Sequence, residues 1–246
     1  MTNFGDDLNT LLIHKLNYNE PLINVNQSFI NRENKTFFMF IGSVLMWADQ
    51  NTIVWGAGYM SPNSHVRARP KKICAVRGKL TRNQLIKQGF NCPEIYGDPA
   101  LLLPRFIKSD GWNKFKLGIM PHYVDQGHVL LHKFRNRKDI LFINARWNVE
   151  KIIRAITHCE RIASSCLHGI IVADAYNIPS IWIKLSDKVH GKGFKFRDYF
   201  SSVNRKIRDP LIMNRNTTLK TIFDRFVNYR IEIDLDKLYK SCPLRK

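Results

Sequence analysis

The sequence has no apolar run long enough to cross a membrane. Its longest apolar stretches, Phe37 to Ile41 with Val44 to Ala48, and Gly169 to Ala175, fall far short of the ~20 residues that a spanning helix needs. The first residues, Met1 to Asp7, carry neither the basic nor the apolar segment of a secretory signal. We therefore expect a cytoplasmic protein.

The sequence also lacks the common motifs of metal, redox and nucleotide sites. The number of cysteines, five, is odd, and no two of them have the C-x-x-C spacing of a zinc or redox site. The carboxylates are not clustered, and neither a P-loop nor a G-x-S-x-G elbow is present. We expect reduced thiols, no metal site and no bound cofactor.

Acidic residues are few. The sequence has 39 lysines and arginines but only 20 aspartates and glutamates, so the formal net charge is +19. Such a surplus favours an anionic partner, which could be nucleic acid, a membrane surface or a phosphorylated or carboxylated substrate. The alternative is charge that serves solubility only. The sequence shows no signature of a nucleic-acid-binding module, so we expect no nucleic-acid partner.

Along the chain, short strand-like runs alternate with segments that have a helical pattern. Short apolar runs end in turn residues at 37–41, 52–55, 73–76, 94–96, 116–120, 140–143, 161–163 and 179–183, and helices are expected at 81–88, 150–158 and 167–176. This alternation predicts an α/β fold with a mostly parallel sheet, in which ligands bind where the strands end.

A polar, basic stretch, Lys108 to Lys114, is the best candidate for a linker. It divides the chain into an N-terminal half, 1–110, and a C-terminal half, 111–200. Residues 201–246 are basic and carry a helical apolar pattern, so we expect a helical tail that packs back on the two halves.

The segment Ser164 to Gly169 is the strongest candidate for chemistry. It places His168 where a helix begins directly after a buried strand, beside the hydroxyls of Ser164 and Ser165. A phosphate or carboxylate would gain there from free N–H groups and from the helix dipole, and a histidine could transfer a proton. The alternative, a histidine that only bonds a neighbouring loop, is about as well supported by position alone.

Other candidates also follow predicted strands or precede predicted helices. Arg77 and Arg146 each follow a strand and suit an anion, because a guanidinium offers two parallel donors. Their alternative is a surface salt bridge. His122 follows Pro121, and a structural role is at least as well supported for it. At the N-terminus, Gly5 allows a ligand to approach the backbone, whereas Asp6 or Asp7 can simply cap the helix that follows.

Six segments in order, taken together, resemble the polysaccharide pyruvyl transferase family: NFGDDL from Asn3, WGAG from Trp55, VRGKLT from Val76, GDPALLLP from Gly97, PHY from Pro121 and SSCLHG from Ser164. The resemblance implies two Rossmann-like halves facing a cleft, as in the two-domain (GT-B-like) glycosyltransferases. It also implies phosphoenolpyruvate as donor, with no other cofactor, and a sugar with two suitably placed hydroxyls as acceptor.

The resemblance also associates His168 with the donor. From the residues themselves we expect His168 to be catalytic, either in acid–base work or by stabilising phosphate, and we expect the donor to be bound by Arg77, Arg146, Ser164, Ser165, Gly169 and His122. The acceptor side or its loops would contain Asn3, Gly5, Asp6 and Gly56. Two features depart from the family. Cys166 stands where some members have an arginine. Many members also have a strand ahead of the segment that begins at Asn3, whereas here only Met1 and Thr2 precede it. Either the N-terminal half lacks its first strand or the true start lies upstream.

These observations predict a pyruvyltransferase that forms a ketal on a surface polysaccharide or its lipid-linked precursor. Two other functions stay open: a glycosyltransferase that uses a nucleotide sugar, and a polyanion-binding protein without catalysis. A lipid-linked acceptor would place the enzyme at the cytoplasmic face of an anionic membrane. Two clusters in the tail would then attract it, Arg205, Lys206 and Arg208, and Lys237, Lys240, Arg245 and Lys246.

Overall fold

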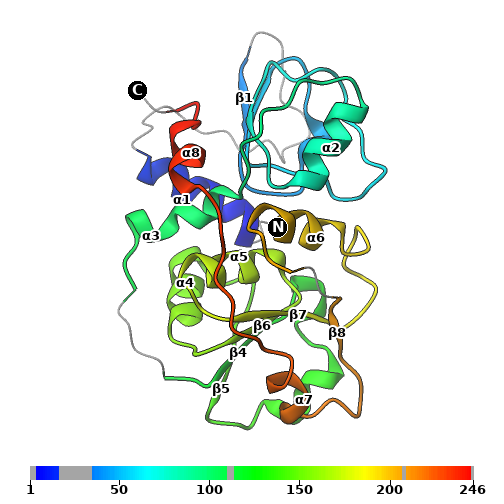
Figure 1. Ribbon diagram of the computed structural model, residues 1–246. Coiled ribbons are helices and arrows are strands. Elements are labelled where there is room, and N and C mark those ends of the chain that lie inside the picture. The colour runs from blue at the N-terminus through cyan, green and yellow to red at the C-terminus, as the bar shows by residue number, and fades with distance from the viewer. Residues whose placement is uncertain (1–3, 17–34, 110–113, 207–208, 245–246) are drawn as a thin grey trace.

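Two parallel β-sheets organise the computed structural model, which describes residues 4–16, 35–109, 114–206 and 209–244 (Figure 1). The first sheet has the order β1-β2-β3 and contains β1 (Phe37–Met39), β2 (Thr52–Trp55) and β3 (Lys72–Ala75). The second has the order β5-β4-β6-β7-β8 and contains β4 (Leu117–Met120), β5 (Ile140–Phe142), β6 (Ile162–Ser164), β7 (Ser180–Lys184) and β8 (Leu211–Ile212). Neighbouring strands in both sheets run parallel, so the predicted α/β class is confirmed.

Helices connect and cover these strands. The α-helices are α1 (Phe4–Lys15), α2 (Lys79–Lys87), α3 (Leu103–Phe106), α4 (Val149–Thr157), α5 (Leu167–Ala175), α6 (Phe194–Ser202), α7 (Leu219–Phe223) and α8 (Leu235–Lys240). Four 3₁₀ segments complete the set: η1 (Leu45–Trp47), η2 (Pro99–Leu102), η3 (Tyr123–Asp125) and η4 (Val129–Phe134). Asp6 and Asp7 lie in the first turn of α1, which begins at Phe4, so they are placed to interact with the helix dipole but do not occupy the N-cap position.

The second sheet is covered on both faces. Met120 and Ile162 pack into a core shared with α4 and α5, whereas their neighbours Ile119 and Ala163 pack into another core with η4 and α7. This division follows from the alternation of side chains along a strand. Helix α5 is apolar all round and is buried, which fits its place between this sheet and the rest of the molecule.

Helices α5 and α6 lie between the two sheets (Figure 1). Helix α5 packs against η2, and α6 packs against α2. The contact with α2 is polar at its centre. The carboxylate of Asp198 in α6 accepts hydrogen bonds from the backbone N–H and the hydroxyl of Thr81, both at 2.7 Å. Helix α6 therefore caps α2 in place of the residue before it, Gly78, which offers no side chain.

The tail contacts both halves of the chain. Strand β8 extends the second sheet, whereas the indole of Trp55 in β2 donates a hydrogen bond to the carbonyl of Leu238 in α8 at 3.0 Å. The predicted linker lies partly outside the described residues, and the boundaries at 110 and 200 stay a prediction. Within the ranges that the structure describes, no helix is both long enough and apolar enough to cross a membrane.

Candidate functional site

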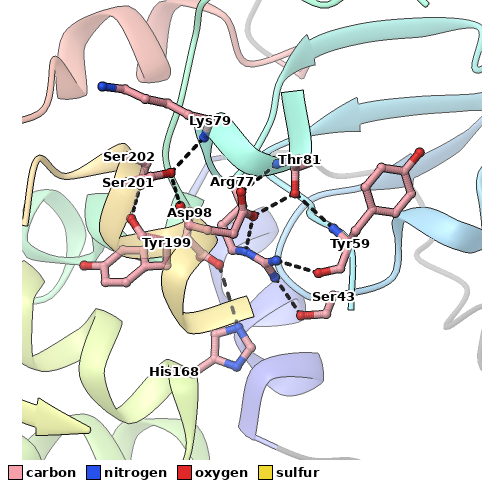
Figure 2. A network of polar contacts seen from close by, with 11 residues as sticks. Ser43, Tyr59, Arg77, Lys79, Thr81, Asp98, His168, Tyr199, Ser201 and Ser202 are labelled. Carbon is pink, nitrogen blue, oxygen red and sulfur yellow. Dashed lines mark hydrogen bonds and ion pairs between the residues drawn. The ribbon is translucent and has the colours of Figure 1, made fainter. Parts of the chain in front are cut away.

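His168 lies in the first turn of α5, where the chain turns away from β6. Its side chain is 14% exposed, and its Nε2 atom is buried without a hydrogen-bond partner in the described part of the chain. The carboxylate of Asp98 faces this atom, with Oδ2 at 3.7 Å from Nε2 (Figure 2). That separation is longer than a hydrogen bond, so the imidazole is held near the carboxylate without being bonded to it.

Gly5 provides the surface against which the imidazole packs. A β-carbon at Gly5 would lie 2.3 Å from Cε1 and 2.4 Å from Nδ1 of His168, so no larger residue fits there without displacing the ring. Gly5 is the second residue of α1. The N-termini of α1 and α5 therefore meet at His168, and both present the positive ends of their dipoles there.

Asp98 is fully buried and begins η2. Its Oδ1 accepts a hydrogen bond from the backbone N–H of Ala100 at 3.0 Å, whereas Oδ2 has no hydrogen-bond partner among the described residues. Burial raises the pKa of Asp98 to about 7, against the opposing effects of that N–H and of Arg77. Near neutral pH, this carboxyl group is therefore close to the midpoint of its titration.

The charge state of His168 is set by burial and by neighbouring cations. Burial, together with the charges of Lys195, Arg77 and His122, lowers the pKa of His168 to about 3. The imidazole is therefore neutral at pH 7. It can accept a proton, and an anion bound beside it would raise its pKa by offsetting the cations.

Lys195, in the first turn of α6, is a site residue that the sequence did not reveal. Its side chain is nine-tenths buried, and burial lowers its pKa. The described residues offer its ammonium group no hydrogen bond or ion pair, and the ring of Phe196 is 5.8 Å away. A buried cation without a counter-ion is costly, so Lys195 marks a place where an anionic ligand would be stabilised.

His122 and the serines of the β6–α5 turn adjoin this group. Burial, followed by the charge of Lys195, lowers the pKa of His122 to about 4. Its Nδ1 is buried and has no hydrogen-bond partner within the ranges described. The backbone N–H of His122 donates to the hydroxyl of Ser165 at 2.8 Å. The hydroxyl of Ser164 is already used within the turn, where it lies 2.9 Å from the carbonyl of Met120 and accepts from the N–H of Cys166 at 3.0 Å. Gly169 packs against Ser164 and Met120.

Arg77 is fully buried and its guanidinium is engaged by protein groups (Figure 2). Nε donates to Asp198 at 2.9 Å, and the two terminal nitrogens donate to the hydroxyl of Ser43 and the carbonyl of Tyr59, both at 2.6 Å. The charge of Arg77 still reaches His168 and lowers its pKa. Arg77 therefore links the N-terminal half to α6 through these hydrogen bonds. Direct contact between Arg77 and a donor stays a prediction.

The remaining predicted residues lie farther from this group or outside the described chain. Arg146 is exposed after β5, and β4 separates that edge strand from β6. Gly56 has a φ of +90° and packs directly on Pro99, which explains a glycine there by backbone geometry. Asp6 lies in the first turn of α1, and Asn3 lies outside the described residues.

No group of three or more histidine, cysteine, aspartate or glutamate side chains that could hold a metal ion occurs in the described part of the chain. A pocket lies elsewhere, between β7 and residues 225–229, and His168 does not line it. The site around His168 is instead recognised by its charges. It combines two helix N-termini, a buried lysine and two neutral histidines.

This arrangement defines an α/β protein with a basic site for an anionic ligand, placed where strands of the second sheet end. Residues 3–187 match the polysaccharide pyruvyl transferase family, a family of transferases, and the chain belongs to it.

Two relatives extend this result. The chain is 30% identical over 205 residues to the uncharacterized protein L143 of Acanthamoeba polyphaga mimivirus, with 81% of this chain and 70% of that protein covered. It is 28% identical over 205 residues to the succinoglycan biosynthesis protein ExoV of Rhizobium meliloti (strain 1021), with 80% of this chain and 60% of ExoV covered. No solved structure matches the chain.

Proposed function

We propose that this protein transfers pyruvate from phosphoenolpyruvate to a sugar of a cell-surface polysaccharide, or of its lipid-linked precursor, and forms a cyclic ketal. The observation that carries the proposal is the largely buried side chain of Lys195, whose ammonium group has no counter-ion among the described residues and lies beside His168 and His122. Phosphoenolpyruvate carries a phosphate and a carboxylate, and such a cation stabilises either of them.

Lys195 also offers a positive charge near Cys166, the position where this chain departs from some members of the family. Some members of the family have an arginine at this position, where the present chain has a buried thiol whose pKa is raised by burial. The charge of Lys195 acts on this thiol, so the two groups are close. We infer that Lys195, from another helix, supplies the positive charge that an arginine at position 166 would have given.

The reaction needs two proton acceptors and one leaving group. A proton is added to the terminal carbon of the enol, one sugar hydroxyl loses its proton and attacks the central carbon, and the C–O bond to phosphate breaks. The second hydroxyl then closes the ring and loses its proton, so that one hydroxyl proton ends on the methyl group and the other on phosphate. His168 is neutral before the donor binds and suits the removal of a hydroxyl proton.

The two parallel sheets fit an arrangement of two Rossmann-like halves that face a cleft, as in two-domain glycosyltransferases. In such an arrangement, the C-terminal half would hold the donor at α5 and α6, and the N-terminus of α1 would lie on the acceptor side, against His168. A lipid-linked acceptor would bring the protein to the cytoplasmic face of the membrane. These finer assignments are part of the proposal.

The test is phosphate release from phosphoenolpyruvate in the presence of candidate glycans, together with detection of the ketal methyl group by NMR. Replacing His168 with Ala or Gln should lower turnover by ~10²–10⁴, the usual contribution of general acid–base catalysis. The control is His65→Ala, which removes an exposed histidine of the N-terminal half. Near-normal turnover in His168→Ala, or transfer from a nucleotide sugar without any reaction of phosphoenolpyruvate, would contradict the proposal.

A further inference from the structure

Two buried polar atoms face each other at the site, Oδ2 of Asp98 and Nε2 of His168, and neither has a hydrogen bond to the residues that the structure describes. They come from opposite halves of the chain, since Asp98 begins η2 and His168 begins α5 (Figure 2). Buried polar atoms nearly always form hydrogen bonds in native proteins. Two neighbouring buried atoms without one, both in segments that resemble motifs of the family, therefore need an explanation.

We propose that Asp98 is a positioning residue for His168, which selects the tautomer with its proton on Nε2 and thereby leaves Nδ1 as the proton acceptor. The proposal rests on the proposed function, in which His168 takes a hydroxyl proton. It assigns the two ring nitrogens separate tasks.

The geometry of Asp98 leaves one oxygen free for this task. Capping η2 uses only Oδ1, through the N–H of Ala100. An ionised Oδ2 can only accept a hydrogen bond, so it stabilises a proton on the nitrogen that faces it. The present 3.7 Å would have to shorten by about 1 Å to form that bond, and hydrogen bonds of this kind commonly tighten when the substrate binds.

The charges around His168 explain why the pair is not an ion pair before the donor binds. Lys195 of α6, Arg77 after β3, His122 after β4, and Cys166 before α5 all face this region. The cations among them disfavour an imidazolium. A bound donor brings negative charge that offsets Lys195 and Arg77, so the imidazolium formed when Nδ1 takes a proton is stabilised by the donor and by Asp98.

The proton balance of the step is simple. The C=C bond of the donor takes a proton from water at its terminal carbon, and the proton that the second hydroxyl releases on ring closure returns to water. The O–H bond of the first sugar hydroxyl breaks, its electron pair forms the new bond to the central carbon, and its proton moves to Nδ1 of His168. The C–O bond to phosphate then breaks. The proton on Nε2 stays there throughout and faces the Asp98 carboxylate. Nδ1 then gives its proton to the departing phosphate, which restores the neutral ring.

The decisive variant is Asp98→Asn. The Asn carbonyl can still accept from Ala100 N–H, so the cap of η2 is retained, but its NH₂ group would face Nε2 and favour the tautomer with the proton on Nδ1. The same replacement in a serine protease triad preserves geometry and lowers turnover by about 10⁴ through the wrong tautomer. We expect turnover to fall by ~10²–10⁴, with the KM for phosphoenolpyruvate changed far less.

The tautomer itself can be read without any substrate. Two-dimensional ¹H–¹⁵N NMR of the full chain at pH 8, where Asp98 is ionised, should show His168 protonated on Nε2 in the wild type and on Nδ1 in Asp98→Asn. His168→Gln assigns the signals, and Asp139→Asn, which changes a partly exposed aspartate paired with Arg137, is the matched control. Should Asp98→Asn fail to fold, the wild-type spectrum alone still decides the tautomer.

Two results would overturn the inference. A proton on Nδ1 of His168 in the wild type at pH 8 would show that Asp98 does not select the tautomer. Turnover in Asp98→Asn close to the wild-type value would show that the selection has no consequence. If phosphoenolpyruvate is not turned over even by the wild type, the proposed function fails, whereas the tautomer assignment stands or falls on its own spectrum.

Discussion

At the scale of single residues, Lys195 should affect donor binding and protein stability in opposite directions. Replacing Lys195 with Met should raise the KM for phosphoenolpyruvate by roughly ten- to a hundredfold, because a charge-assisted contact with an anion is lost. The same change should raise the melting temperature of the donor-free protein, since a buried cation without a counter-ion is removed.

Donor titrations and thermal melts of the same variants measure both effects. Lys87→Met, at an exposed position of α2, is the matched control and should change neither quantity. A lower melting temperature together with an unchanged KM would show that Lys195 is a structural residue. The opposing signs are useful because a residue that only packs cannot produce them.

Asp98 should impose a dependence of stability on pH. Its pKa is raised by burial to about 7 in the folded protein, from 3.8 without such burial. The folded state therefore binds more protons than the unfolded chain between these values, and the contribution of Asp98 to stability is lost as pH rises from about 4 to about 7. Asp98→Asn removes this loss, so it should be more stable than the wild type at pH 8, by up to a few kcal/mol.

Urea unfolding at pH 8 and pH 5 tests this expectation. The advantage of Asp98→Asn should shrink toward pH 5, because the wild-type carboxyl group then regains its proton in the folded state. The low pKa values of His168 and His122 act with the opposite sign, since both rings must stay neutral in the folded protein. For that reason the variant must be compared with the wild type at each pH. An advantage of equal size at both pH values would contradict the raised pKa.

At the scale of elements, α6 joins the two halves through Arg77. This arginine and Asp198 form an ion pair that is completely buried, and Asp198 also caps α2 through Thr81. Removing one partner of a buried pair leaves the other charge unpaired, which typically costs about 3–5 kcal/mol. Arg77→Ala should lower the free energy of unfolding by that amount, and chemical denaturation measures it.

Two other arginines calibrate this result. Arg137→Ala, which breaks an exposed ion pair with Asp139, should cost less than about 1 kcal/mol. Arg146→Ala also leaves the core untouched because the side chain is exposed, so any rise in the KM for phosphoenolpyruvate in that variant would report donor binding alone. If the denaturation midpoint of Arg77→Ala equals that of the wild type, the ion pair between Arg77 and Asp198 does not stabilise the fold.

The sequence predicts most of the elements but not α6. Strands β2, β4 and β7 and helices α4 and α5 fall close to where their apolar runs and turn residues indicate. Helix α6 was not expected because its residues, FKFRDYFSS, mix aromatic, charged and small side chains, and their burial depends on α2 and β7. Lys195 was missed for the same reason, since local sequence does not tell a buried lysine from a surface one.

Those features of the site that depend only on neighbouring residues in the sequence could be predicted. His168 follows β6 directly, so its place at a helix N-terminus could be inferred from the sequence. Its contacts with Gly5 and Asp98 join segments far apart in the chain, and no periodicity reports them. The resemblance to the family supplied those segments as motifs, whereas the structure shows why two of them must contain a glycine and an acid.

At the scale of the whole molecule, the surplus of positive charge is distributed between interior and surface. The expectation that Arg205 adds to a surface cluster was wrong. Its side chain is only 11% exposed, pairs with Asp174 at 3.1 Å and donates to the carbonyl of Ser180. Arg208, Arg245 and Lys246, which completed the two expected clusters, lie outside the described residues. Lys206, Lys237 and Lys240 remain as described, exposed lysines of the tail.

These lysines carry the last prediction, that the protein docks on anionic membranes. An acceptor on a lipid carrier lies at a membrane surface, and each lysine near an anionic leaflet can contribute about 1 kcal/mol, which salt attenuates. The protein should sediment with vesicles that contain phosphatidylserine at low salt and be released as salt rises. Replacing Lys206, Lys237 and Lys240 with Gln should weaken sedimentation without changing turnover on a soluble acceptor, because none of the three lies at His168. Equal binding to neutral and anionic vesicles, or unchanged binding of the triple variant, would assign the surplus charge to another role.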